Sequence, residues 1–155
     1  MGLSRRRWRT SSAGVLLEEV LVGPAALEYL DALHALLDRF WAAVNGSRGP
    51  RPLADQRTAF ITGLIEIASN IIRYAYPPLS AGKIEIRLRL HRDRLEALLT
   101  DWGQPFVEPE TLAPDRSDEL PESGLGLSLA RRALDRVEYD RDSSGRNHWW
   151  LVKLL

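Results

Sequence analysis

Apolar residues follow two different periods along this chain, and these periods predict its secondary structure. Steps of three and four residues indicate helices, whereas strict alternation of apolar and charged residues over 84–91 is typical of a half-buried strand. Residues 95–100 return as its antiparallel partner across a turn at Arg92–Asp93. The predicted strands cover residues 15–22, 84–91, 95–100, 137–139 and 149–154, and the predicted helices cover 24–44, 53–75 and about four turns over 127–137.

The order of these elements indicates the fold class. A strand and two helices are followed by a hairpin, a long loop, a third helix and a second hairpin. This order predicts an α+β two-layer sandwich, in which the helices pack on one face of a mainly antiparallel mixed sheet. Residues 45–50 are expected to form a loop by composition. Residues 107–123, rich in proline and acidic side chains, form a loop of unusual length, which is typically either functional or disordered.

The length of 155 residues suits one compact domain, which we place at residues 14–155. Residues 1–13 are predicted to be a polar, disordered tail. They contain the basic cluster Arg5–Arg9, for which a docking arm is the alternative to a solvated end.

Composition narrows the range of functions. The 21 basic and 21 acidic side chains give a net charge of zero, which argues against broad electrostatic binding of nucleic acid. The chain has no cysteine, so thiolate catalysis and cysteine metal sites are excluded, and a cytoplasmic location is expected. No apolar run approaches the roughly 18–20 residues that a membrane span requires, so neither a membrane nor a nucleic-acid partner is predicted.

One polar line runs along the second predicted helix, opposite its broad apolar stripe. Glu66, Asn70 and Arg73 fall on nearly the same side at the helical period. A carboxylate can accept a proton from an attacking hydroxyl, and an amide oxygen is a suitable ligand for Mg²⁺. The alternative is that these residues decorate a solvated helix face.

Two further short segments are compatible with nucleotide binding. Asp101-Trp-Gly-Gln-Pro-Phe106 follows a strand, where an ionised Asp can accept a hydrogen bond from an exocyclic amine and Gly103 allows close approach of a flat ring. An ordinary strand-ending turn is the alternative. Ser123-Gly-Leu-Gly-Leu127 precedes an amphipathic helix, where free backbone amides favour a phosphate. Here the alternative is a helix cap formed by Ser123.

Together the three segments resemble the ATP-binding domain of gyrase-type topoisomerases, histidine kinases and a heat-shock chaperone, often called the Bergerat fold. Within it, the bacterial anti-sigma-factor serine kinases share Glu-x-x-x-Asn, Asp-x-Gly-x-Pro-Phe and Gly-Leu-Gly-Leu. The resemblance implies that Glu66 is the general base, that Asn70 binds magnesium, and that residues 107–123 are a lid over ATP. The other nucleotide-binding residues that it implies are Arg73, Asp101, Gly103, Phe106, Ser123, Gly124, Leu125, Gly126 and Leu127.

The resemblance also implies an activity and partners. Members of that family transfer the γ-phosphate of ATP to a serine or threonine of an anti-sigma-factor antagonist and bind a sigma factor, usually as homodimers. Two alternatives stay open: an ATP-binding module that sequesters a sigma factor or another regulator without catalysis, and a stress-signalling switch kinase. Tyr74 and Ser123 depart from the family pattern, which has His and Gly there in many relatives.

Overall fold

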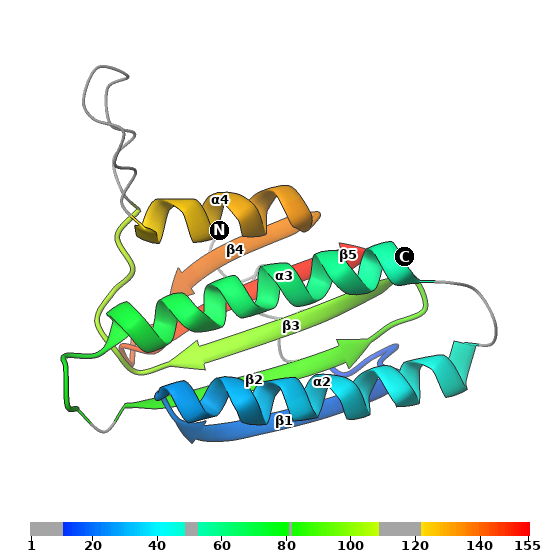
Figure 1. Cartoon of the computed structure of the whole chain (residues 1–155), viewed down its shortest axis with the longest axis horizontal. Helices are drawn as coiled ribbons and strands as arrows, with labels where there is room; N and C mark the ends of the chain where they lie inside the picture. The colour runs from blue at the N-terminus through cyan, green and yellow to red at the C-terminus, as the bar shows by residue number, and fades with distance from the viewer. Residues whose placement is uncertain (1–10, 49–52, 81, 109–121) are drawn as a thin grey trace, which may run out of the picture.

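The computed structural model describes residues 11–48, 53–80, 82–108 and 122–155 (Figure 1). The five strands are β1 (Leu17–Pro24), β2 (Lys83–Leu90), β3 (Arg94–Asp101), β4 (Arg136–Arg141) and β5 (Asn147–Leu154). The helices are α2 (Leu27–Arg48), α3 (Ala54–Asn70) and α4 (Glu122–Ala133), and a π-helical turn, η1 (Ile71–Ala75), continues α3.

The strands form one sheet in the order β1-β2-β3-β5-β4, and each of the four pairings is antiparallel. The helices cover one face of this sheet, with α2 over β1, α3 over the centre and α4 beside α3 (Figure 1). The predicted α+β two-layer sandwich is therefore confirmed, and its described strand pairs are all antiparallel. The alternating residues of β2 explain this arrangement, because Ile84, Ile86 and Leu88 point to the helices and are fully buried.

Several predicted boundaries were wrong. Pro24 ends β1 instead of opening the helix, and α2 continues to Arg48 through residues that were predicted to be a loop. The third helix begins at Glu122 and ends at Ala133, so Val137 belongs to β4. Residues 109–121, most of the predicted lid, and residues 1–10, most of the predicted tail, lie outside the described residues.

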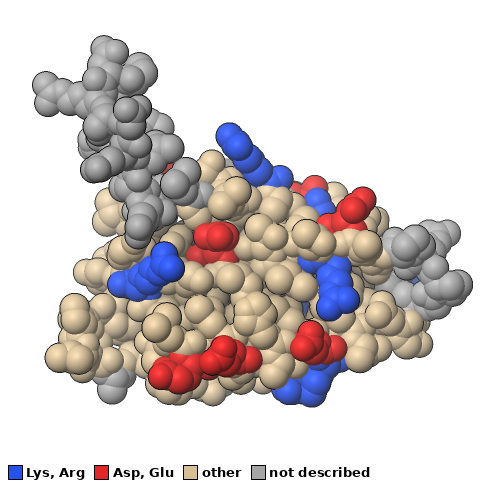
Figure 2. Space-filling model, viewed as in Figure 1, with Lys and Arg blue, Asp and Glu red and all other residues tan. Residues whose placement is uncertain are grey.

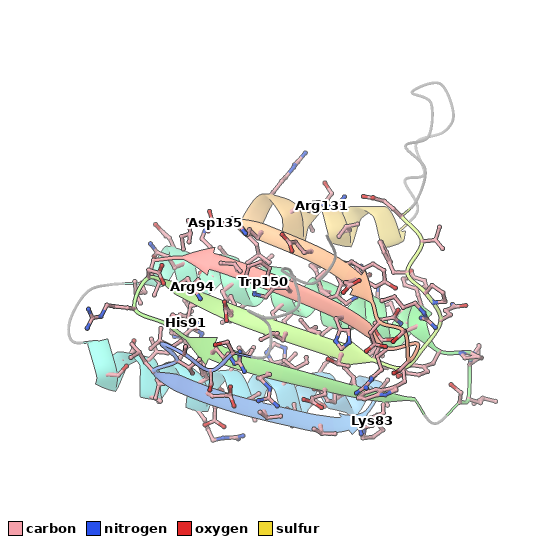
Figure 3. All side chains as sticks on the ribbon, turned by 180° about the vertical axis from the view of Figure 1, so that it is seen from behind. Lys83, His91, Arg94, Arg131, Asp135 and Trp150 are labelled. Atoms are coloured by element: carbon pink, nitrogen blue, oxygen red, sulfur yellow. The ribbon has the colours of Figure 1, made fainter. Side chains whose placement is uncertain are left out.

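The sheet brings three polar residues together at one end. Asp101, the last residue of β3, pairs with Asn147, the first residue of β5, and Asn147 pairs in turn with Arg141 at the end of β4. Residues directly opposite in an antiparallel pair point to the same face of the sheet. All three side chains therefore gather below the C-terminal end of α3. Figure 3 shows that Lys83 marks this end of β2, whereas His91 lies at the opposite, hairpin end.

The helix-covered face carries charges of both signs between larger uncharged areas (Figure 2). Acidic side chains follow α2, whose sequence contains Glu28, Asp31 and Asp38. In the described part of the chain, no helix is long and apolar enough to cross a membrane.

Candidate functional site

A cavity of about 330 Å³ opens where the end of α3 meets the ends of β3, β4 and β5. Its volume lies within the range of about 300–1,000 Å³ that small-molecule sites occupy. Residues from three parts of the chain line it: Asn70, Ile71, Tyr74 and Ala75, then Asp101, Gln104, Pro105, Phe106 and Val107, then Tyr139, Asn147 and Trp149. Gly126 and Leu127 of the third predicted segment do not line this cavity. Asn70, Asp101 and Phe106, which the sequence predicted to bind a common ligand, therefore share one cavity.

Glu66 and Asn70 meet at Gly126, beside this cavity. A Cβ atom on Gly126 would lie 2.7 Å from Oε2 of Glu66 and 3.4 Å from both Nδ2 and Oδ1 of Asn70. The carboxylate and the amide thus approach the same buried point of α4, as their four-residue spacing on α3 predicted. The missing side chain of Gly126 is what lets α4 approach them so closely.

The helix widens into the π turn η1 directly after Asn70. Hydrogen bonds in a π turn run from residue i to i+5, so one turn takes more residues than in an α-helix. The three residues from Asn70 to Arg73 therefore cover a smaller part of a turn than they would in an α-helix. Arg73, predicted to line up with Asn70, is exposed and does not line the cavity, whereas Tyr74 does. The α-helical period assumed for 53–75 did not allow for this change of phase.

The Asp101 side chain is buried, with 1% of its surface exposed. Its Oδ1 atom accepts hydrogen bonds from the Gly103 amide at 2.9 Å and from Nδ2 of Asn147 at 2.7 Å. Burial raises the pKa of Asp101, while these two hydrogen bonds act in the opposite direction. Asp101 is thus a buried acceptor at the cavity wall, as the reading of an exocyclic amine requires.

Gly103 allows the loop after β3 to lie directly against η1. A Cβ atom there would lie 2.2 Å from the carbonyl oxygen of Ala75, which no L side chain tolerates. The next residue fixes the contact, because the Gln104 amide donates to the same Ala75 oxygen at 2.8 Å and Nε2 of Gln104 donates to the Tyr74 carbonyl. The predicted close approach at Gly103 is therefore to the protein's own backbone.

Three aromatic rings form the apolar side of the cavity. The centroid of Phe106 lies 4.8 Å from that of Trp149 and 5.5 Å from that of Tyr139, and both pairs are edge-on. The Tyr139 hydroxyl accepts a hydrogen bond from the Phe106 amide at 3.0 Å, which holds the loop to β4. An apolar wall with a few fixed polar groups is the usual composition of a small-molecule site.

Ser123, Gly124 and Leu125 lie in the first turn of α4, and Leu127 is buried against the core. Since the helix begins at Glu122, the Gly124 amide is among the four first-turn amides that have no partner within the helix. Ser123 stands inside the helix and not before it. Binding of phosphate by these residues stays a prediction.

Comparison with known proteins agrees with this geometry. The model of the histidine kinase-like ATPase domain matches residues 24–153, most of the chain. The chain belongs to this family. Membership implies an ATP-binding domain, and the cavity described above is the place where its polar and aromatic residues converge.

Among curated proteins, the chain is similar to bacterial serine-protein kinases named RsbW. The protein of Halalkalibacterium halodurans is 36% identical over 85 residues, which cover 50% of this chain and 51% of the relative. That of Bacillus subtilis is 32% identical over 85 residues, which cover 50% and 53%. The chain spans about half the length of the curated relatives it matches, and the predicted relationship to this kinase family is confirmed over that half.

The sequence did not reveal every residue that lines this cavity. Asn147 and Tyr139 line the cavity and contact its other members, but neither belongs to the three motifs. Asn147 stands between Arg146 and His148 at the start of β5, so no signal in the sequence singles it out. Tyr74, noted only as a departure from the family pattern, is 43% exposed at the cavity.

Proposed function

We propose that this chain is an ATP-dependent serine/threonine protein kinase. The observation that supports the proposal best is the convergence of Glu66 and Asn70 on Gly126, next to a cavity whose wall contains the buried Asp101. Phosphoryl transfer depends mainly on positioning the reactants and on neutralising charge. A carboxylate and an amide oxygen at one point, with a base-sized cavity beside them, supply groups for both requirements.

Each residue takes one role in this proposal. Asp101 accepts a hydrogen bond from the amino group of adenine, and the aromatic wall at Phe106 packs against the base. Glu66 orients the serine or threonine hydroxyl of the substrate protein and accepts its proton while the hydroxyl oxygen attacks the γ-phosphorus. The bond from that phosphorus to the bridging oxygen breaks, and ADP leaves.

Magnesium is proposed to bind at the same site. Asn70 offers an amide oxygen, a hard ligand of the kind that Mg²⁺ prefers together with phosphate oxygens. When bound, the ion neutralises charge on the phosphates during transfer. The Gly124 and Gly126 segment is proposed to receive the phosphate tail at the start of α4, with residues 107–123 as the lid.

The proposed substrate is an anti-sigma-factor antagonist, and a sigma factor is the second proposed partner, with a homodimer as the proposed assembly. These proposals rest on the similarity to proteins named serine-protein kinase RsbW, over half of their length. A cytoplasmic location is proposed on the same ground.

The test is a transfer assay with labelled ATP and the cognate antagonist protein. Wild type is expected to label a serine or threonine, whereas Glu66→Gln is expected to bind ATP normally and to lose transfer by more than about a hundredfold. Asp55→Asn, an exposed carboxylate in the first turn of the same helix, is the matched control and should transfer like wild type.

A second measurement separates magnesium from the chemistry. Calorimetric titration with ATP, with and without Mg²⁺, should show that Asn70→Ala loses most of the magnesium-dependent part of the affinity. Equal magnesium dependence in both proteins contradicts the role of Asn70. Tight ATP binding without any labelling of the antagonist rejects the kinase and favours the alternative of a sequestering ATP-binding module or of a switch kinase with another substrate.

A further inference from the structure

Asn147 is a buried amide at the centre of the site, and it belongs to none of the predicted motifs. Only 1% of its surface is exposed. Its Nδ2 atom donates to Oδ1 of Asp101 at 2.7 Å, to the Gly103 carbonyl at 3.2 Å and to the Gln104 carbonyl at 3.0 Å. One side chain from β5 therefore contacts both the carboxylate and two carbonyls of the turn that follows β3.

The neighbours of Asn147 determine which way its amide points. Its Oδ1 atom accepts a hydrogen bond from Nη1 of Arg141 at 2.8 Å and another from the Tyr139 hydroxyl. An arginine can only donate, so the atom facing Arg141 must be the amide oxygen. The amide nitrogen then faces Asp101, where the two backbone carbonyls also require a donor. A reversed amide would place its nitrogen, a donor, against the Arg141 guanidinium and its oxygen, an acceptor, against the Asp101 carboxylate.

This fixed orientation determines what Asp101 can offer to a ligand. Each oxygen of an ionised carboxylate has two acceptor positions, and those of Oδ1 are taken by Asn147 and by the Gly103 amide. Among the described residues, no hydrogen bond reaches Oδ2. Since both partners of Oδ1 are donors, a proton on Asp101 would have to sit on Oδ2, the oxygen left for the ligand.

We propose that Asn147 is a positioning residue that keeps Oδ2 of Asp101 an acceptor, and that it thereby makes the site selective for purines with an amino group at position 6. The inference rests on the proposed ATP site and adds to it the residue that sets base preference. Inosine triphosphate has a carbonyl at position 6 and a hydrogen on N1, where ATP has an amino group and a bare N1, so an acceptor on Asp101 that faces position 6 meets an acceptor on the base. Removal of the Asn147 donor makes protonation of Asp101 easier, because its ionised form loses a hydrogen bond, and a protonated Asp101 can donate to that carbonyl.

The experiment compares the dissociation constants of ATP and inosine triphosphate between pH 5 and pH 8. Wild type is expected to prefer ATP by about a hundredfold. The amino group of adenine gains a hydrogen bond to the charged Asp101, whereas inosine triphosphate leaves the buried carboxylate oxygen that faces position 6 of its base without a donor. In Asn147→Leu the preference should fall below about tenfold. The pH below which ATP affinity is lost should also move upward, because the pKa of Asp101 rises further.

Two additional variants separate positioning from folding. Asn147→Thr keeps a hydroxyl donor for Asp101 but loses the contacts to the Gly103 and Gln104 carbonyls, so it should melt earlier and yet keep the preference for ATP. Lys153→Met changes a residue six positions further along β5, whose Nζ lies 3.5 Å from Oδ2 of Asp135, and should change neither the preference nor the pH profile. It leaves Arg141 and His148 in place, whose charges lower the pKa of Asp101.

The outcomes distinguish the inference from the proposed function. A wild type that binds no ATP defeats the proposed function itself. If wild type binds ATP but Asn147→Leu weakens both nucleotides equally, with an unchanged pH profile, Asn147 is only structural and the inference is overturned. If the Leu variant does not fold, the Thr variant decides: a retained preference at a lower melting temperature supports the inference, and a lost preference overturns it.

Discussion

The substitution Gly126→Ala tests the central geometric claim about the site, because it adds one methyl group where Glu66 and Asn70 meet. The new Cβ would lie 2.7 Å from Oε2 of Glu66, whereas ordinary contacts begin at 3.4 Å. The carboxylate would therefore have to move by ~0.7 Å, the difference between these distances. The two amide atoms of Asn70, at 3.4 Å, would be touched but not displaced.

The expected effects on stability and on turnover differ strongly. Oε2 is the end of a flexible side chain, so the overpacking cost should be near the low end of the usual range of about 1–3 kcal/mol. Replacing glycine by alanine inside a helix returns about 1 kcal/mol. We therefore expect the free energy of unfolding to change by less than about 1 kcal/mol. Turnover should fall by about a hundredfold, because a misplacement of the order of 1 Å in a catalytic group has that effect.

The assay pairs urea denaturation with labelled-phosphate transfer on the same preparations. Gly63→Ala is the matched control, because its Cβ would lie 2.4 Å from Cδ1 of Leu134, the residue after α4, and none of its closest contacts is to Glu66 or Asn70. It should lose stability while keeping turnover well below its melting temperature. Wild-type turnover in Gly126→Ala, or a loss that merely follows its stability, would refute the assigned position of Glu66.

Three other changes have defined outcomes. Gly103→Ala should cost about 1–3 kcal/mol of unfolding free energy and weaken ATP binding, as seen by denaturation and calorimetry, because the Ala75 carbonyl is backbone and cannot move aside. Burial raises the pKa of Asp101, so the stability that this group contributes is present below its unfolded pKa of about 4 and is lost as pH rises through the raised pKa. Asp101→Asn cannot ionise, so in urea denaturation at a series of pH values it should be at least as stable as wild type at pH 7. Calorimetry should nevertheless show that it no longer binds ATP. The hydrogen bond from His148 lowers the pKa of Asp142 to about 2, so the stability that Asp142 contributes is present above about pH 4 and disappears as pH falls towards 2. Asp142→Asn should reduce this loss of stability at acid pH by less than about 1 kcal/mol, because solvent screens a pair at the surface, and an unchanged acid loss would contradict the assignment.

The sequence predicted the layers of the fold because the elements that build the core have strong periods. The alternation of Ile84, Ile86 and Leu88 with charged residues can place only one face of β2 against the helices. The ends of helices were less predictable where the local composition favours a loop but packing against the core favours a longer helix. Asn45 and Gly46 suggest a loop, but the buried Val44 belongs to the same helix, and α2 continues through them to Arg48.

The relative placement of the candidate residues was predicted where it depends on spacing within one element. The helical period puts Glu66 and Asn70 on one side of α3, and Asp101 lies at the end of a strand as expected, whereas their roles were implied by the family resemblance and stay predictions. Asn147 acts through contacts with Asp101, which is 46 positions earlier in the chain, and with Arg141, which is 6 positions earlier. These contacts exist only once β3, β4 and β5 are paired. No local pattern encodes such a register, and the same holds for the change of phase at Arg73.

The widened turn after Asn70 joins two parts of the site that the chain keeps far apart. Its Tyr74 side chain lines the cavity and is 43% exposed. The next residue, Ala75, accepts a hydrogen bond through its carbonyl from the Gln104 amide in the loop that follows Asp101. A partner protein that bound Tyr74 and shifted it would thus displace the neighbouring Ala75 carbonyl, and with it the loop that follows Asp101. Nucleotide residence and partner engagement would then be mechanically linked without any large rearrangement of the sheet.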